Sequence, residues 1–406
     1  MTTPPALAEL LAAVDAERMT ATADALAGRA YGGRRAGSPG GAAARDWLGE
    51  RLAGIGAEVS TVPFAVRAVP EIYAVPEAFW HDRSRRRRLT FGRQVQPHLA
   101  SADLPSPRRG DLMVAGTDDP VGRWLLVPSG MSLFEAYGRA HGAAGLLIGR
   151  GTDPDGWHYT TLAGSDPGPL PMLTLDPATH ASMIAAESRG WLAASAPIRR
   201  VDRTATNLLA RWHPAGGLLL TAHYDGVGDH PGLRQPGASD NASGVAVVLE
   251  SARVLAPIRS GGAGLAVALL DAEELGALGS AHHAAQLRAA GAAPLVINVD
   301  GAGRLEGAAA VEAGGPAHAL LARLDQAGRH AGLPLKPGPV ASDNRRYAAA
   351  GLAAVGIGPG MGGYHSPADT PDRVDPHTLT AVCRLVVATA WLAAADTTTV
   401  SSLIGD

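Results

Sequence analysis

The amino-acid sequence predicts an α/β fold, with a mostly parallel mixed central sheet covered by helices on both faces and a small inserted β-rich α/β domain. Two patterns indicate this fold. From residue 206 onward, short apolar runs alternate with segments of helical period, as in parallel strands joined by helices. Between about residues 69 and 200, prolines become frequent and the apolar runs are short. We therefore expect residues 1–66 and 203–406 to build the main domain and residues 67–202 to form the insertion.

The expected elements follow from the spacing of apolar residues. Leu7, Leu10, Leu11 and Val14 share one face at helical spacing, which predicts a helix over residues 7–26. In chain order the others are a helix at 42–54, strands at 59–66 and 124–127, a helix at 133–141, strands at 144–148, 207–212 and 218–222, a helix at 245–255, a strand at 265–270, a helix at 280–290, a strand at 295–299, a helix at 316–331, a strand at 353–357 and a helix at 378–395.

Composition narrows the class of protein. The chain has 406 residues, 46% of them hydrophobic, and a formal net charge of −3, which favours neither nucleic acid nor an anionic membrane as a partner. The single cysteine, Cys383, excludes an internal disulfide and suits a reducing compartment. Residues 1–18 lack the order of a secretory signal, so we expect a cytoplasmic protein. The oligomeric state is not predicted. The arginine run at 83 and 85–88 predicts a solvated face or loop rather than a nucleic-acid patch.

A glycine-rich connection at residues 221–244 carries the first candidate site residues. His223 and Asp225 are two residues apart, so they share a face if the strand extends that far. A histidine backed by a carboxylate is the usual arrangement at metal sites. Asp240 precedes the expected helix at 245–255 and is a candidate ligand, but it is equally a candidate N-cap.

Further ligand-type side chains follow the later strands. Glu273 and Glu274 come after the run 265–270, Asp300 after 295–299, and His365 after 353–357. The carboxyl ends of such strands meet at one edge of the sheet, where ligands bind. Two histidines with several carboxylates suit zinc, manganese or cobalt. The surplus of carboxylates predicts a pair of divalent ions, about 3.5–4 Å apart in two-metal hydrolases.

Several motifs carry a family resemblance. The sequence resembles the zinc-dependent exopeptidases that include aminopeptidase Y, glutamate carboxypeptidase II and the transferrin receptor, and residues 121–150 look like a protease-associated domain. The matching motifs are GRRAGSPG at 33–40, HYD at 223–225, GASDNASG at 237–244, DAEELGALGS at 271–280, NVDG at 298–301 and YHSPADT at 364–370.

The resemblance implies a set of five metal ligands, for two ions that are expected to be Zn²⁺. In this sequence His223 and Asp300 would bind one metal ion, Glu274 and His365 would bind the other, and Asp240 would bridge them.

The resemblance also implies catalytic roles. Asp225 would orient His223, and Glu273 would act as the general base. The base assignment agrees with the chemistry, because Glu273 remains free to take a proton while its neighbour Glu274 holds a metal ion. The hydroxyl of Tyr364 is a candidate donor to the tetrahedral oxyanion.

The expected activity is that of an aminopeptidase acting on peptides with a free N-terminus. A dipeptidase, a carboxypeptidase or a glutaminyl cyclase on the same scaffold is the alternative enzyme, and a non-catalytic receptor-like binding protein is the alternative from another class. The sequence departs from the family at Asn344, where relatives often have histidine. The adjacent Arg345 and Arg346 can reach an acidic substrate group or face water.

Overall fold

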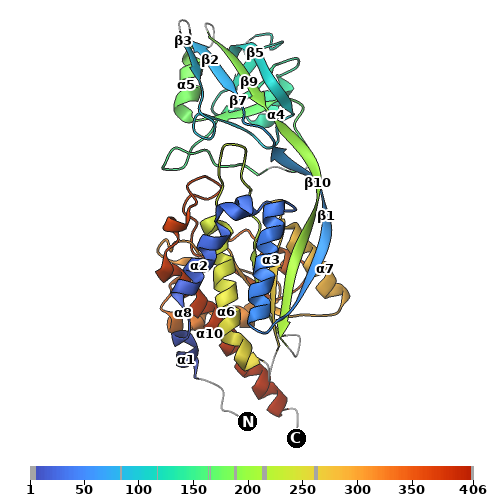
Figure 1. Cartoon of the computed structure of the whole chain (residues 1–406), viewed down its shortest axis with the longest axis vertical. Helices are drawn as coiled ribbons and strands as arrows, with labels where there is room; N and C mark the ends of the chain where they lie inside the picture. The colour runs from blue at the N-terminus through green and yellow to red at the C-terminus, as the bar shows by residue number, and fades with distance from the viewer. Residues whose placement is uncertain are drawn as a thin grey trace.

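Two long antiparallel strands join two lobes of the molecule (Figure 1). The computed structural model describes residues 6–82, 85–116, 118–162, 164, 166–186, 190–212, 217–259 and 264–403. In it β1 (Glu58–Ile72) pairs with β10 (Ile198–Trp212), with a shift of register between Val66 and Val69. The predicted domain boundaries, 66/67 and 202/203, fall inside these strands. The division of the chain into domains stays a prediction.

The lower lobe contains a mixed eight-stranded sheet in the order β1-β10-β12-β11-β13-β16-β14-β15. Its centre is parallel, because β11 pairs in parallel with β12 and β13, and β13 pairs in parallel with β16. The antiparallel pairs lie toward its two edges. This confirms the predicted fold class. The strands not yet defined are β11 (Leu218–His223), β12 (Leu265–Leu270), β13 (Leu295–Val299), β14 (Ala309–Gly314), β15 (Leu335–Pro337) and β16 (Ala354–Gly358).

Helices cover both faces of this sheet. Alternate strand residues point to opposite faces, so Leu218 and Leu220 belong to one apolar core while Leu219 belongs to another. The helices on the first core are α1 (Leu7–Ala12), α2 (Ala16–Leu26), α3 (Pro39–Gly54), α6 (Ser243–Arg259), α8 (His318–Ala331) and α10 (Pro376–Leu403). Those on the second are α7 (Leu278–Ala289) and α9 (Asn344–Ala349).

The helix predicted over residues 7–26 is wrong in one respect, because it is broken into α1 and α2. Asp15 has an extended backbone, and its carboxylate accepts hydrogen bonds from the backbone N–H groups of Glu17 and Arg18. An N-cap aspartate of this kind starts a new helix. The backbone N–H of Asp15 also donates to Oε1 of Glu250, which ties the start of α2 to α6.

Helix α10 belongs to the core of the lower lobe. Its segment Pro376–Ala394 is long and apolar enough to cross a membrane. However, 61% of the most apolar stretch of 18 residues within it is buried in the structure. It packs against α6 and α8. The long apolar surface of α10 is therefore used in packing between helices.

The upper lobe contains a second eight-stranded sheet, in the order β3-β2-β9-β5-β6-β7-β8-β4. The arginine run forms β3 (Arg85–Arg88), an exposed strand at the edge of the sheet rather than a loop, and Arg83 lies outside the described residues. The guanidinium of Arg86 lies 4.3 Å from the ring of Phe79 in β2. The other elements are β2 (Ala78–Asp82), β4 (Val95–Pro97), β5 (Leu104–Val114), β6 (Trp124–Val127), α4 (Leu133–Gly138), β7 (Gly145–Gly149), β8 (Met172–Leu175), α5 (Pro177–Ala185) and β9 (Gly190–Ala196).

Candidate metal centre

The candidate site lies beyond the carboxyl ends of the central parallel strands. Strand β11 ends at His223, and Asp240 lies in η3 (Ala238–Ala242), between β11 and β12. The segments that follow β12, β13 and β16 carry Glu274, Asp300 and His365. All five are buried, with exposed fractions of 7% or less: His223, Asp240, Glu274, Asp300 and His365.

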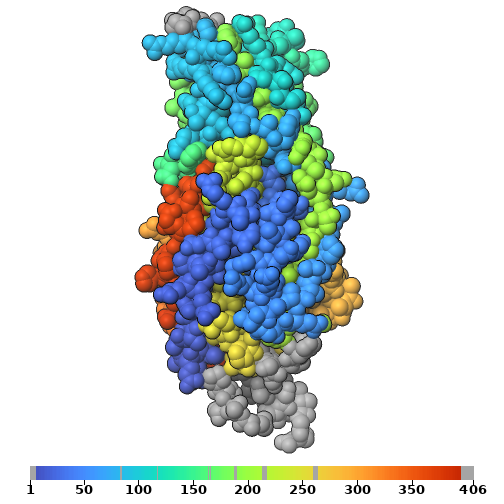
Figure 2. Space-filling model, in the orientation of Figure 1, coloured from blue at the N-terminus to red at the C-terminus, as the bar shows by residue number. Residues whose placement is uncertain are grey.

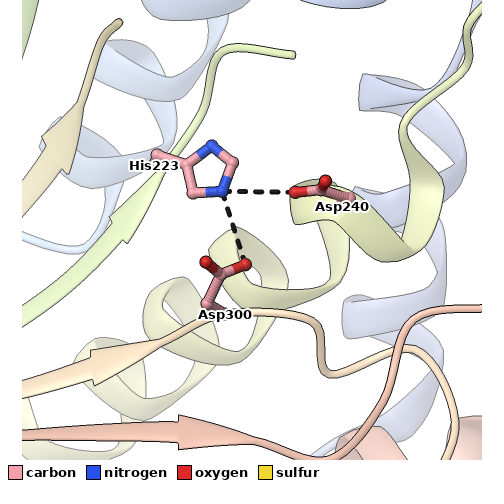
Figure 3. A group of neighbouring side chains, drawn as sticks. All are labelled: His223, Asp240 and Asp300. Atoms are coloured by element: carbon pink, nitrogen blue, oxygen red, sulfur yellow. Dashed lines mark hydrogen bonds and ion pairs between the residues drawn. The ribbon is translucent and has the colours of Figure 1, made fainter. Parts of the chain in front are cut away.

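The first group of side chains surrounds His223. Its Nε2 atom lies 3.3 Å from Oδ1 of Asp240 and 3.4 Å from Oδ1 of Asp300. Figure 3 shows the two carboxylates pointing at the same edge of the imidazole ring. One ligand atom from each residue lies within 4.8 Å of the others, so the group can surround one metal ion.

The second group surrounds His365. Its Nε2 atom lies 3.0 Å from Oδ2 of Asp240 and 2.9 Å from Oε2 of Glu274. Asp240 therefore belongs to both groups, with one carboxylate oxygen facing each histidine. Although the structure brings together the five side chains that the sequence singled out, their roles as ligands stay a prediction.

The side chain that caps the start of α6 is that of Asn241, and not that of Asp240. Asp240 lies in the short turn η3 (Ala238–Ala242) before α6, and its peptide bond to Asn241 is cis. Oδ1 of Asn241 accepts hydrogen bonds from the backbone N–H groups of Gly244 and Gly301, and its Nδ2 donates to the carbonyl of Val299. Asn241 thus satisfies backbone groups at the start of α6, and the side chain of Asp240 is free to face the histidines.

The donor set fits divalent cations. Buried carboxylates are costly unless cations or hydrogen bonds compensate them, and this site gathers several. Oε2 of Glu274 faces His365 closely without forming a well-oriented hydrogen bond. Burial opposes the charged form of His223, yet the carboxylates of Asp300, Asp225 and Asp240 raise its pKa well above the ordinary value. The site therefore attracts positive charge to the space between these oxygens and imidazole nitrogens, the atoms that zinc prefers.

Asp225 links the first histidine to the two glutamates. Nδ1 of His223 lies 3.5 Å from Oδ1 of Asp225 and 3.3 Å from its backbone carbonyl. The Asp225 carboxylate also accepts hydrogen bonds from the backbone N–H groups of Glu273, at 3.0 Å, and Glu274, at 3.3 Å. One buried carboxylate thus fixes the backbone of the predicted base and lies beside the ring of a predicted ligand.

Glu273 faces a cavity next to the two groups. The cavity has a volume of about 730 Å³ and is lined by Glu273, Glu274 and Tyr364, among others. Burial raises the pKa of Glu273 well above its ordinary value, and Asp343 and Asp300 raise it further, while His223 acts in the opposite direction. A carboxylate with a raised pKa is a stronger base, which suits proton transfer near neutral pH.

Tyr364 lines the same cavity, and its ring stacks on His365 with a centroid distance of 3.6 Å. Burial raises the pKa of its hydroxyl, and the nearby carboxylates of Asp240 and Glu274 contribute to the rise. The hydroxyl is therefore protonated at neutral pH and can donate a hydrogen bond.

The two arginines that follow Asn344 also line the cavity, but both guanidinium groups already have partners. Nε of Arg345 pairs with Oε1 of Glu312 at 2.8 Å, and Arg346 donates to the carbonyl of Gly276 at 2.6 Å. Nδ2 of Asn344 lies 3.4 Å from Oε2 of Glu312. Binding an acidic substrate group would therefore compete with these contacts.

Sequence reasoning missed Arg34, which contacts the loop between His223 and Asp240. The Arg34 side chain is fully buried and donates to the carbonyls of Tyr224, Leu26, Pro236, Gly237 and Asp240. Burial lowers its pKa, whereas the carboxylates around the site, Asp369 first among them, raise it. The motif GRRAGSPG at 33–40, which includes Arg34, was the available signal, but it does not show which of its two arginines is fully buried.

Asp369 was also missed. Its Oδ1 accepts a hydrogen bond from the backbone N–H of Ser239 at 2.6 Å, and its Oδ2 accepts one from the backbone N–H of Asp240 at 3.0 Å. It lies in the segment that follows His365, so it ties the loop of one predicted ligand to the backbone of another. The motif YHSPADT, which includes Asp369, was the available signal.

Comparison with known proteins identifies the family. Residues 207–390 match the sequence profile of "Peptidase family M28". This part of the chain belongs to peptidase family M28. The protein therefore contains a metallopeptidase domain, and the resemblance to zinc-dependent exopeptidases is confirmed. The likeness of residues 121–150 to a protease-associated domain stays a prediction. The matched segment includes all five predicted ligands together with Asp225, Glu273 and Tyr364.

One known protein is similar in sequence over a short segment, and several solved structures are similar in fold. Aminopeptidase YwaD of Bacillus subtilis (strain 168) is 47% identical over 66 residues, which span 16% of this chain and 13% of that protein. The structure resembles the zinc aminopeptidase BSAP from Bacillus subtilis (TM-score 0.73, 20% identity, 94% of this chain and 95% of that chain covered). It also resembles an aminopeptidase from Aneurinibacillus sp. strain AM-1 (0.70, 22%, 96% of each chain) and, at a lower score, Porphyromonas gingivalis glutaminyl cyclase (0.53, 15%, 94% and 99%). At these identities the solved structures show the shared fold alone.

Proposed function

We propose that this M28 protein is a two-metal exopeptidase that removes N-terminal residues from peptides. The observation that carries the proposal is the position of Asp240, whose two carboxylate oxygens face two different histidines. A carboxylate shared by two ligand groups is the arrangement that a pair of neighbouring ions requires. The family match and the aminopeptidases among its relatives support hydrolysis of peptide bonds.

The proposed ligands follow from the two groups. His223 and Asp300 would hold one ion, Glu274 and His365 the other, and Asp240 both. The histidine and carboxylate donors, together with the zinc aminopeptidase among the structural relatives, favour Zn²⁺. When bound, such ions polarise the peptide carbonyl and lower the pKa of water.

The remaining residues would move and hold protons around the scissile bond. Glu273 takes a proton from the attacking water as the new C–O bond forms at the carbonyl carbon. It then delivers that proton to the amine nitrogen as the C–N bond breaks, so the same carboxylate serves as base and acid. Tyr364 donates a hydrogen bond to the carbonyl oxygen as negative charge develops there. Asp225 keeps His223 and the backbone of Glu273 in place.

The first experiment is to replace the proposed base. In Glu273→Gln we expect kcat on aminoacyl anilides to fall about 100- to 10,000-fold, the usual contribution of a general base, while the zinc content stays at the wild-type value. Glu50→Gln is the matched control, because Glu50 is an exposed residue of α3. Unchanged turnover in Glu273→Gln would disprove the role of Glu273.

The second experiment tests the metal ligands and the end of the peptide from which residues are removed. His223→Ala should lose about one bound zinc ion per chain, and an unchanged zinc stoichiometry would show that the ligand assignment is wrong. Peptides with free N-termini should be cleaved, whereas N-blocked peptides should not. Cleavage of blocked peptides from the C-terminus would favour a carboxypeptidase, and activity confined to dipeptides a dipeptidase.

Glutaminyl cyclase activity is a second candidate, because cyclases share this fold. A peptide with N-terminal glutamine separates the two reactions. An aminopeptidase releases free glutamine and a shortened peptide, whereas a cyclase releases ammonia and leaves the peptide bonds intact.

A further inference from the structure

A loop of the upper lobe reaches across to the loop that carries His365. In Figure 2 teal-green residues from this part of the upper lobe border the red residues of the C-terminal part of the chain. The backbone N–H of Thr160 donates to the carbonyl of His365 at 2.7 Å. The hydroxyl of Ser366 donates to Oδ2 of Asp153 at 2.6 Å. The upper lobe therefore contacts the backbone of one proposed ligand and the residue directly after it.

These contacts are shielded from water. Asp153, Thr160 and Ser366 have exposed fractions of 3%, 1% and 1%. A hydrogen bond from a hydroxyl to a buried carboxylate is among the stronger kinds. At the more exposed side of the contact between the two loops, Asp155 and Arg373 form an ion pair.

Asp153 and Thr160 of the upper lobe each accept further hydrogen bonds. Oδ1 of Asp153 accepts hydrogen bonds from the backbone N–H groups of Asp155 and Trp157, which leaves Oδ2 for Ser366. Oγ1 of Thr160 accepts from Gln96 of the upper lobe and from Gln235 of the loop between β11 and α6. Hydrogen bonds therefore tie this loop both to the rest of the upper lobe and to the loop between β11 and α6.

The backbone of His365 needs such support. Its φ angle is +51°, in the left-handed region that residues with a side chain rarely adopt. Such a conformation persists only where the surroundings fix it. The ring must at the same time hold Nε2 between Asp240 and Glu274.

We propose that Asp153 and Thr160 are positioning residues for His365, through which the upper lobe sets the zinc affinity of the His365–Glu274 group. This inference rests on the proposed two-metal function. The other group, formed by His223, Asp300 and Asp240, has its own support at Asp225, which lies beside the ring of His223. Loss of the Ser366 to Asp153 bond should therefore weaken one zinc site and leave the other unchanged.

The test is a titration of the metal-free full-length protein with Zn²⁺, followed by calorimetry and by competition with a chromophoric chelator. The wild type should bind two ions. Ser366→Ala should weaken one of the two sites about 10- to 100-fold, the usual effect of removing a residue that orients a ligand. The matched control is Ser132→Ala, which removes the N-cap hydroxyl of α4 elsewhere in the upper lobe. It should leave both zinc affinities unchanged.

A second variant keeps the test decisive if Ser366→Ala does not fold. Asp153→Asn retains an oxygen for the bonds from Asp155 and Trp157 but removes the negative acceptor that Ser366 uses. It should weaken the same zinc site, and the double variant with Ser366→Ala should lose no more than the larger single effect.

The outcomes separate the two proposals. A wild type that binds no Zn²⁺ would overturn the two-metal function. A wild type with two sites, both unchanged in Ser366→Ala and Asp153→Asn, would overturn the positioning role and leave the function intact. Equal weakening of both sites would also overturn it, because that is the result expected of general destabilisation.

Discussion

Replacing Arg34 with lysine is expected to destabilise the protein strongly although it preserves the charge. The Arg34 guanidinium uses all three nitrogens to contact five backbone carbonyls, four of them at 2.7–2.9 Å and that of Asp240 at 3.4 Å. These carbonyls belong to the end of α2, to the loop between β11 and η3, and to η3 itself. One side chain therefore closes the loop that separates His223 from Asp240.

The magnitude follows from the number of bonds that lysine cannot make. An ammonium has three donors on one nitrogen, whereas arginine has five on a planar fork. At least two of the five contacts of Arg34 must be lost. Hydrogen bonds that involve a charged group contribute about 1.5–3 kcal/mol each, so we expect a loss of at least about 3 kcal/mol. Against a typical total of about 5–15 kcal/mol, this is a large fraction of the free energy of unfolding.

The assay is urea unfolding of Arg34→Lys at pH 7.5, compared with Arg29→Lys. Arg29 lies in the same segment but is exposed, so its replacement should change the free energy of unfolding by less than about 0.5 kcal/mol. Since Arg34 contacts the backbone beside two proposed ligands, Zn²⁺ affinity should fall as well. A free energy of unfolding within 1 kcal/mol of the wild type, roughly the value of a single hydrogen bond, would refute the view that Arg34 holds this loop.

Two further predictions concern the same loop. Burial and the neighbouring guanidinium of Arg35 lower the pKa of His230 to about 3, so the unfolded chain binds a proton below pH 6.5 that the folded chain does not. Stability should be full above pH 6.5 and fall as the pH drops toward 3, by up to about 1.4 kcal/mol per pH unit. In urea unfolding between pH 7 and 4, His230→Asn should lower the slope of the free energy of unfolding against pH by the amount that one bound proton contributes. An unchanged slope would exclude His230 as the source. Asp369→Asn should weaken both zinc sites about 10- to 100-fold, because Asp369 supports the shared Asp240, and weakening of a single site would contradict this.

The sequence was sufficient to predict the fold class, the central strands and the groups of side chains at their ends, because these depend on local patterns. Strands β14 and β15 had no counterpart among the predicted strands. Each central strand is a short apolar run. Three of these runs lead directly into a polar residue, namely His223, Asp271 and Asp300, and His365 follows the fourth after a glycine-rich loop. Parallel pairing then brings segments as distant as His223 and Asp300 together, since β11 and β13 are neighbours. To predict that the candidate residues lie close together, it was enough to predict that parallel strands and helices alternate along the chain.

The supports of the site could not be predicted in this way. Arg34 lies 190 residues before the Tyr224 carbonyl that it contacts, and Ser366 lies 213 residues from Asp153. Such contacts depend on the exact paths of loops, which leave no periodic trace in the sequence. The cap role of Asn241 was missed for a different reason. Aspartate and asparagine are almost equally good N-cap residues, so the pair Asp240-Asn241 did not indicate which side chain turns toward the helix.

The upper lobe is connected to the site through strand β10 and through the loop that contains Asp153 and Thr160. Strand β10 leaves that lobe and pairs with β12, and the backbone N–H of Thr206 in β10 donates to Oδ2 of Asp271, two residues before the proposed base. The second connection includes the contact of Thr160 with His365. Leu162 of the upper lobe also forms part of the wall of the cavity that Glu273 and Tyr364 line. The upper lobe therefore contacts the loop of a proposed ligand and lines part of the cavity, so its residues belong to the surroundings of the candidate site.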